Sequence, residues 1–271
     1  MILDGTYYID DVPLSATPFA ADPEFPARSS HVLDLLRGPR GGQPIHSVHG
    51  GGQRAAAGIT IGSGATTEDL RNWAVQAKDA ALPAGGAEFF EAMLAIKGLG
   101  SVRHPIERLR PGASLFADGS ASAYSAAMLD RARRENLPVT PMPNDVFRAA
   151  ESSSQAMDEW TKIVGDALSR TGRCLMTIGR PMQSEPGDPA HLQRALAEGV
   201  ETVLKRHTLA NLLLAGGATA SAVCRRLGWT AFDVRGELTG GVVQLEPQDP
   251  TAPHVIVKPG SYPWPELVWW H

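Results

Sequence analysis

Cysteine is scarce in this sequence, which contains only Cys174 and Cys224. Each lies inside an apolar segment, with no second cysteine or histidine at the spacing of metal ligands. This scarcity argues against a disulfide framework and against a structural zinc site. We therefore expect two core thiols in a protein of a reducing compartment.

Concentrated positive charge and long apolar runs are also missing. The formal net charge is -4, and the densest group of cations, Arg131, Arg133 and Arg134, fits a solvated helix face. Proteins that bind nucleic acid carry a basic patch, which this chain lacks. No apolar stretch approaches the roughly 20 residues that span a bilayer, and the first residues lack the pattern of a signal peptide. We expect a cytoplasmic protein that binds neither nucleic acid nor membrane.

The common signatures of nucleotide sites and hydrolases are absent as well. The chain has no Gly-Lys-Ser/Thr of a P-loop and no Gly-x-Gly-x-x-Gly turn. The run from His49 to Gly52 is similar to an esterase oxyanion loop, but no Gly-x-Ser-x-Gly elbow accompanies it. His46 and His49 are three residues apart on a predicted strand and its end, so they would not face one metal. We predict no metal site, and no carboxylate pair identifies a catalytic base.

Apolar runs and helical periodicity alternate regularly in the second half. Strands that alternate with helices at this spacing pair in parallel through right-handed crossovers. The sequence therefore predicts an α/β fold whose C-terminal domain is a doubly wound, mostly parallel sheet. The predicted strands are 114–117, 138–142, 173–178, 212–215, 231–234 and 255–257, and the predicted helices include 123–135, 154–169 and 189–207.

The first half predicts a partial α/β domain. Residues 1–30 are rich in turn formers and predict an extended excursion, followed by a short helix that Ser30 can cap. Strands are expected at 44–48 and 58–61, a helix begins at Thr66 or Thr67, and Gly85 and Gly86 open another. We predict two β-to-α units here. Periodicity lapses over 97–112, so the domain limits are predicted as 1–105 and 106–271.

A strand, glycine turn and helix unit over residues 212–227 stands out in the second half. The three leucines at 212–214 predict a buried strand, and Gly216 with Gly217 predicts a tight turn into a helix. In open α/β folds such a turn lies at the carboxyl end of a strand, where N–H groups and the helix dipole suit a phosphate. The alternative is an ordinary connection whose glycines only permit the turn.

Three loops of the second half follow predicted strands, whose carboxyl ends share one edge of a parallel sheet. Glycines permit close approach of a ligand, hydroxyls can bind phosphate oxygens, and a lysine supplies positive charge. We predict that the loops converge on one ligand; the alternative is that the serines cap a helix and the lysine lies on the surface. The candidates are Ser120 and Ser122, then Gly216, Gly217, Thr219, Ala220 and Ser221, then Lys258, Pro259, Gly260 and Ser261.

Four blocks of the second half resemble the four-carbon acid sugar kinases, a family formerly described as a domain of unknown function. The blocks are Gly119–Ser122, Gly216–Val223 with Leu227–Gly228, Gly236–Leu238 with Gly241–Val242, and Lys258–Tyr262. The first half resembles the later part of the family's sugar-acid domain. Its matching pieces are Asp4–Tyr8 with Val12–Leu14, Thr17–Ala20 with Asp22–Pro23, Thr67–Leu70, and Gly85–Gly86.

The resemblance implies an N-terminal sugar-acid domain and a C-terminal nucleotide-binding domain. ATP with Mg²⁺ would bind at the three loops, and its terminal phosphate would pass to a hydroxyl of a small sugar acid such as threonate, erythronate or an oxo-tetronate. The implied role is in carbohydrate metabolism. Gly85 and Gly86 are the implied substrate-binding residues.

Three features depart from the family's pattern. The Asp-Asp-x-Thr-Gly turn with which family members open is absent, so the chain is expected to begin after that segment. Ala218 replaces a usual acidic or polar residue, and Gly64 replaces a usual aspartate. Two functions therefore stay open: an active kinase, or a catalytically impaired nucleotide- or sugar-acid-binding paralogue or subunit of a split kinase. A sheet lacking strands would keep a bare edge, so we also expect a homodimer.

Overall fold

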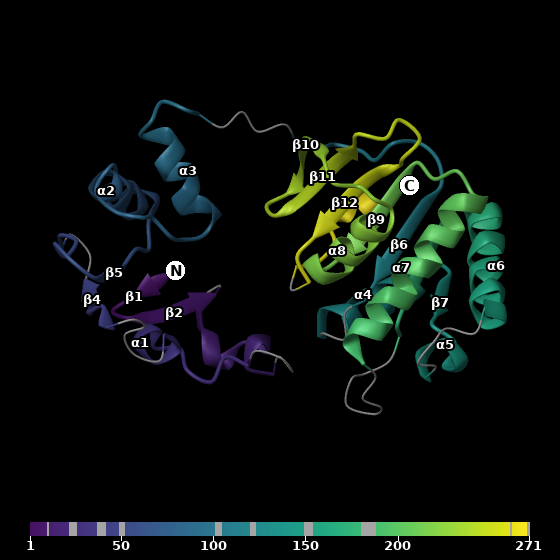
Figure 1. The fold of residues 1–271 in the computed structure, drawn as a ribbon, viewed down its shortest axis with the longest axis horizontal. Helices are drawn as coiled ribbons and strands as arrows, with labels where there is room; N and C mark the ends of the chain where they lie inside the picture. The colour runs from purple at the N-terminus through teal and green to yellow at the C-terminus, as the bar shows by residue number, and fades with distance from the viewer. Residues whose placement is uncertain are drawn as a thin grey trace. The chain divides into compact units, whose positions relative to one another are not determined.

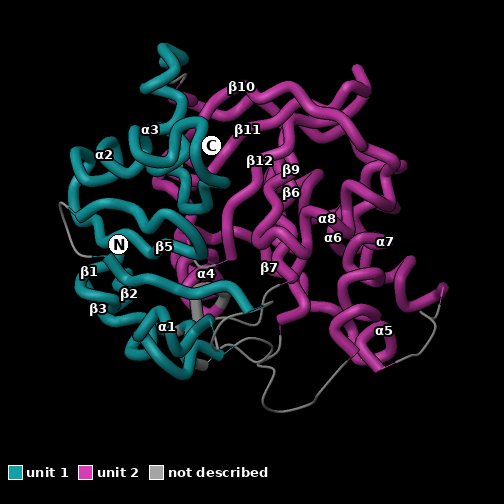
Figure 2. The backbone as a smooth tube through the Cα atoms, turned by 60° about the vertical axis from the view of Figure 1, so that its left-hand side comes forward, with its two compact units in different colours: residues 1–102 teal, residues 103–271 magenta. Residues whose placement is uncertain are grey.

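The chain divides into two compact units, Met1–Val102 and Arg103–His271 (Figure 2). The structure is a computed structural model that describes residues 1–9, 11–21, 26–36, 42–48, 52–100, 105–119, 123–148, 154–179, 188–260 and 262–269. Both units mix helices and strands, so the predicted α/β class is confirmed.

Unit 2 is built on a seven-stranded sheet with the order β10-β11-β12-β9-β6-β8-β7 (Figure 1). Five neighbouring strands are parallel, and β10 and β11 form an antiparallel hairpin at one edge, so the predicted mostly parallel sheet is confirmed. The prediction missed β11 and made β10 too short. The strands are β6 (Ser114–Asp118), β7 (Val139–Pro141), β8 (Arg173–Thr177), β9 (Asn211–Ala215), β10 (Phe232–Thr239), β11 (Val242–Pro247) and β12 (His254–Lys258).

Helices cover both faces of this sheet because alternate residues of its buried strands point to opposite sides. Leu212 and Leu214 pack with residues of α5 (Asn144–Arg148), α6 (Ser154–Thr171), α7 (Pro189–Arg206) and α8 (Gly217–Arg226). Leu213 and Ala215 pack with α4 (Ala123–Arg134) and with the C-terminal segment 262–269, which includes the short helix η4 (Glu266–Val268). The sheet is therefore doubly wound, as predicted.

Unit 1 contains two small sheets. Its strands are β1 (Ile2–Leu3), β2 (Thr6–Ile9) and β3 (Val12–Pro13), which are antiparallel, and β4 (Ile45–Val48) with β5 (Ile59–Gly62), which are parallel. Its helices are α1 (Val32–Leu35), α2 (Thr67–Ala77) and α3 (Ala87–Ala95), with short 3₁₀ turns at Leu14–Ala16 and Pro18–Ala21. The start of the chain is thus a small sheet, and the expected extended excursion is wrong.

Local sequence explains how the helices of unit 1 begin, with two corrections. The N-cap of α2 is Thr66, whose Oγ1 accepts from the N–H of Asp69 at 3.1 Å while the Asp69 carboxylate accepts from the N–H of Thr66 at 3.0 Å. Ser30 does not cap α1, because its Oγ accepts from the N–H of Ser15 and His31 stands at the cap. No strand lies between α2 and α3 in the described residues 78–86, so the second predicted β-to-α unit is wrong.

Candidate functional site

The carboxyl ends of the central strands form one row of small and polar residues. In register, Lys258 of β12 lies opposite Ala215 of β9, Ala215 opposite Asp118 of β6, and Asp118 opposite Thr177 of β8. Their exposed fractions are 4%, 1%, 1% and 0%, respectively. The loops that follow β6, β9 and β12 all leave the sheet at this row.

The described parts of the three loops lie close together, and their convergence on one ligand stays a prediction. The N–H of Gly216 donates to the carbonyl of Lys258 at 2.9 Å. A Cβ added to Gly260 would meet the Cα of Gly216 at 3.9 Å, and one added to Gly119 would meet Thr219 Oγ1 at 2.6 Å. The second loop therefore touches both others. Three of the candidates, Ser120, Ser122 and Ser261, lie outside the described residues.

The second loop ends in the exposed first turn of α8. Gly216 has φ +90° and ψ 141°, a conformation that only glycine adopts readily, and it turns the chain from β9 into the helix. The N–H of Ala220 closes the first turn on Gly216, so the N–H groups before it have no partner inside the helix. Gly217 and Ala218 are exposed, and open space faces Gly217. This turn is suited to an anion because N–H groups and the positive end of the helix dipole meet there.

The other candidates of the second loop differ in exposure. Thr219 and Ala220 are buried, and Thr219 packs toward Gly119 as described. Ser221 is exposed, and its Oγ accepts from the guanidinium of Arg225 at 3.2 Å. Thr219 and Ala220 therefore shape the loop, whereas Ser221 already has a hydrogen-bond partner on the same helix.

Lys258 lies in the core at the end of β12, so the alternative of a surface lysine is wrong. Its Nζ donates to the carbonyl oxygen of Pro259 at 3.2 Å and to that of Gly260 at 3.4 Å, and it lies 5.6 Å from the centre of the Trp264 ring. Burial lowers the pKa of Lys258, and the negative charge of Asp118 partly opposes this shift. The lysine thus places positive charge at the junction of the second and third loops.

Asp118 is a polar residue of this row to which sequence reasoning gave no role. It ends the buried run of β6 and shares the sheet face of Lys258 across Ala215. Its position in the sequence, directly after an apolar strand, could have identified it as a candidate site residue. A turn explained it equally well, because aspartate is common where strands end.

The two glycines proposed for substrate binding lie in unit 1. Gly85 and Gly86 are exposed, and Gly86 is the N-cap of α3. A Cβ on Gly85 would meet the Phe89 ring at 2.6 Å, so this glycine lets the chain pass close to α3. Gly85 therefore has a structural reason, and a role of either glycine in binding stays a prediction.

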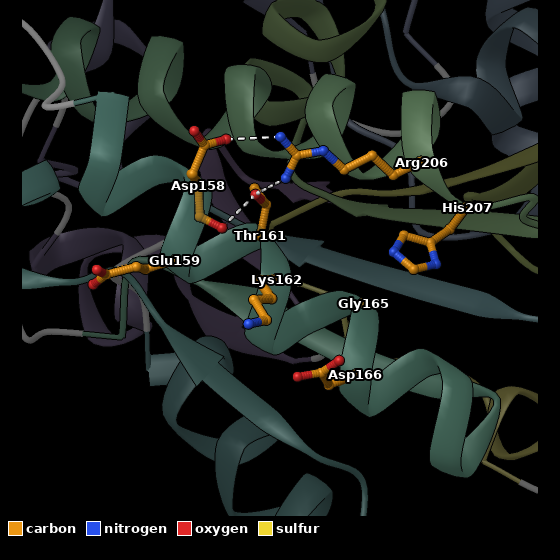
Figure 3. A pocket seen from close by; sticks show the side chains of 8 residues that line it. All are labelled: Asp158, Glu159, Thr161, Lys162, Gly165, Asp166, Arg206 and His207. Atoms are coloured by element: carbon orange, nitrogen blue, oxygen red, sulfur yellow. Dashed lines mark hydrogen bonds and ion pairs between the residues drawn. The ribbon is translucent and has the colours of Figure 1, made fainter.

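A shallow cavity of about 360 Å³ lies on α6 and the end of α7 (Figure 3). Arg206 donates to the Asp158 carboxylate at 2.7 Å and to Thr161 Oγ1 at 3.3 Å, and His207 lies against Gly165. Arg206, Asp158 and Thr161 thus form one hydrogen-bonded group in this cavity. Because the end of α7 leads into the amino end of β9, the cavity is distant from the carboxyl edge and belongs to a different part of unit 2.

The described ranges contain no cluster of metal ligands and no membrane-spanning helix. No group of three or more His, Cys, Asp or Glu side chains gathers there as metal ligands would. Nor does any helix in those ranges have the length and apolar character to cross a bilayer.

A known family matches the part of the chain that contains this site. The family described as the nucleotide-binding C-terminal domain matches residues 115–262, which include all three loops. No curated protein matches the sequence significantly.

Solved structures with low sequence identity share the fold. One is a protein of Salmonella typhimurium LT2 described as a putative tRNA synthase, with 15% sequence identity and a TM-score of 0.70. The match covers 99% of the present chain and 68% of that protein. The chain is 17% identical, with a TM-score of 0.60, to protein HI1011 of Haemophilus influenzae, of the family DUF1537, over 96% of this chain and 67% of that one. The chain thus spans about two thirds of the length of both.

Proposed function

The chain belongs to the family of the nucleotide-binding C-terminal domain, and we propose that its second unit binds ATP at the three loops of the carboxyl edge. The observation that carries the proposal is the proximity of the loops: the N–H of Gly216 donates to the carbonyl of Lys258, and a Cβ on Gly260 or on Gly119 would lie 3.9 Å from Gly216 Cα or 2.6 Å from Thr219 Oγ1, respectively. The matched region, residues 115–262, spans all of them. The proposed domain limits are 1–105 for substrate and 106–271 for nucleotide.

The residues present fit the phosphates of a nucleotide. The first turn of α8 offers backbone N–H donors beside open space, and the paired glycines Gly216 and Gly260 keep side chains out of that approach. Lys258 adds positive charge behind the loops. Mg²⁺ would arrive with the phosphates, since it keeps several waters and takes few protein ligands in such sites.

We propose further that the bound ATP supplies a terminal phosphoryl group to a hydroxyl of a four-carbon sugar acid of the threonate, erythronate or oxo-tetronate class. Phosphoryl transfer depends mainly on positioning and on neutralising charge. In this proposal the α8 N–H groups orient the phosphates, Lys258 offsets their charge, and unit 1 holds the acid near Gly85 and Gly86. The family resemblance of both halves supports it. No residue is assigned as the catalytic base.

A second function is favoured by one observation. Ala218 stands exposed in the first turn of α8, so the turn can bind phosphate without offering a side chain to the reaction. In the four-carbon acid sugar kinases that the sequence resembles, this position usually carries a polar or acidic side chain. We therefore keep as the alternative a catalytically impaired binding paralogue, or a subunit of a split kinase. In either case a homodimer is expected.

The test separates binding from turnover. Calorimetry measures ATP binding with Mg²⁺ to the chain and to two variants of one position, Gly217→Pro and Gly217→Ala. Proline removes one backbone N–H, yet it suits the first position of a helix, and the ψ of 141° at Gly216 suits a following proline. Because hydrogen bonds to charged groups contribute about 1.5–3 kcal/mol, Gly217→Pro should weaken ATP at least about tenfold, whereas Gly217→Ala should not.

Phosphorylation of threonate, erythronate and an oxo-tetronate by the chain alone completes the experiment. Turnover supports the kinase, and ATP binding without turnover supports the impaired paralogue or split subunit. Absence of ATP binding with Mg²⁺ present would contradict both functions. Equal ATP affinity of the two Gly217 variants would contradict the placement of phosphate at α8.

A further inference from the structure

Two oppositely charged side chains share one face of the sheet at the row described above. Asp118 and Lys258 belong to β6 and β12, two strands apart, and Ala215 of β9 stands between them in register. In-register neighbours of a parallel sheet point to the same side. Because Ala215 carries only a methyl group, the two longer side chains can extend over it toward each other.

The burial of this pair requires each charge to be compensated. Asp118 is 1% exposed and Lys258 is 4% exposed. A buried ammonium without compensation is costly and tends to lose its proton. The carbonyls of Pro259 and Gly260 accept from Lys258 Nζ but bring no net charge. The charge that supports the ammonium comes from Asp118, which acts on it across Ala215.

The geometry of the third loop depends on this ammonium. Lys258 Nζ donates to both carbonyls that follow it in the chain and so curls the loop back on the end of β12. Gly260, the second of these acceptors, lies against Gly216. A neutral amine would donate more weakly, and the turn before α8 would lose its fixed neighbour.

We propose that Asp118 is a positioning residue of the nucleotide site, which keeps Lys258 charged so that the third loop stays folded against Gly216. The inference rests on the proposed nucleotide binding. It assigns to Asp118 no contact with the nucleotide or with Mg²⁺. The residue acts through Lys258, whose other described neighbours at the ammonium, the two carbonyls and the Trp264 ring, do not titrate.

The test measures ADP affinity by calorimetry from pH 6.5 to 8.5, with EDTA and with Mg²⁺, for the intact chain and for Asp118→Asn. Without the carboxylate, Lys258 should lose its proton within this range, because an uncompensated buried lysine can titrate several pH units below its ordinary value. We expect nearly constant affinity in the intact chain. In Asp118→Asn the affinity should fall by about tenfold or more across the range, since one proton is linked to binding.

Matched variants isolate the mechanism. Asp130→Asn makes the same chemical change at an exposed aspartate of α4, paired with Arg133 at 3.0 Å, and should leave the profile unchanged. In a Lys258→Met background, Asp118→Asn should add no pH dependence. If Asp118→Asn does not fold, Asp118→Ser, with a smaller polar group, takes its place in the same measurements.

Each result decides the proposal. Loss of affinity by the same factor at every pH would identify a purely structural role and overturn it. A loss seen only with Mg²⁺ would identify a metal ligand and overturn it as well. Absence of ADP binding by the intact chain would contradict both the proposed function and this inference. If the intact chain binds ADP but Asp118→Asn has a parallel pH profile, only this inference is contradicted.

Discussion

Gly119 provides a direct test of how the first and second loops meet. A Cβ at this position would lie 2.6 Å from Thr219 Oγ1 and 3.3 Å from Leu196 Cδ2. The first distance is far inside van der Waals contact, and Thr219 is buried, so its side chain has little room to move. Gly119→Ala should therefore overpack the junction of the loops, although the added group is a single methyl.

The expected cost is about 1–3 kcal/mol, the usual range for extra methyl groups in a packed site. For a unit of this size each kcal/mol lowers the melting temperature by about 2–4 °C. Urea unfolding followed by the fluorescence of the tryptophans in unit 2 measures the change. Gly240→Ala, at a glycine with open space around it, is the matched control and should change stability by less than about 0.5 kcal/mol.

A double-mutant cycle makes the test specific to the contact. In a Thr219→Ala background the hydroxyl that would meet the new methyl is gone, so Gly119→Ala should cost about 1–2 kcal/mol less there than in the intact chain. An equal cost in both backgrounds would refute the convergence of these two loops. A cost near zero in the intact chain would refute it as well.

Three further outcomes follow from other parts of the chain. Gly216→Ala should lower the free energy of unfolding by about 1–3 kcal/mol, because a φ of +90° strains any residue other than glycine. The added Cβ would meet no atom closer than 4.0 Å, so the cost comes from the backbone alone. An unchanged free energy in urea unfolding would contradict this. Burial raises the pKa of Cys174 to about 11, so the folded thiol should resist iodoacetamide at pH 8. Burial of the neutral thiol contributes fully to the free energy of unfolding below about pH 8.5, the pKa of a thiol in the unfolded chain. This contribution should decline as the pH rises toward 11, because the unfolded chain then loses the thiol proton more readily than the folded chain. Thr66→Ala should destabilise unit 1 by about 1 kcal/mol through loss of the α2 cap, and Thr67→Ala, inside the helix, should not; equal melting shifts would count against the cap.

Features encoded in neighbouring residues could be predicted from the sequence. A buried strand, a turn and a helix were predicted from the run Leu212–Leu214 and the glycines after it, because apolar runs and positive-φ turns have local signatures. The start of α2 was predicted at Thr66 or Thr67 for the same reason, and the structure places the N-cap at Thr66. The parallel sheet followed from the alternation of such units, and with it the shared edge at which the loops converge.

Features that depend on long-range register were not predictable in the same way. The hairpin of β10 and β11 was missed because its alternation is interrupted where the register shifts between Val234 and Gly236. The sequence predicted no core role for the C-terminal segment, yet Trp264 and Trp269 pack on Phe116 and cover one face of the sheet. Nothing within the segment specifies the strand it meets.

The burial of Lys258 changes how the loss of a polar residue at position 218 should be interpreted. A site that bound phosphate mainly through side chains would lose affinity with alanine at position 218, because alanine has no polar side-chain group. In the proposed site the donors belong to the backbone of α8, which alanine retains, and the positive charge comes from a separate strand. Under the proposed function, alanine at position 218 should therefore affect phosphoryl transfer and leave ATP affinity largely unchanged. An inactive chain that still binds ATP tightly is a coherent outcome, and binding and turnover must be measured as separate properties of this protein.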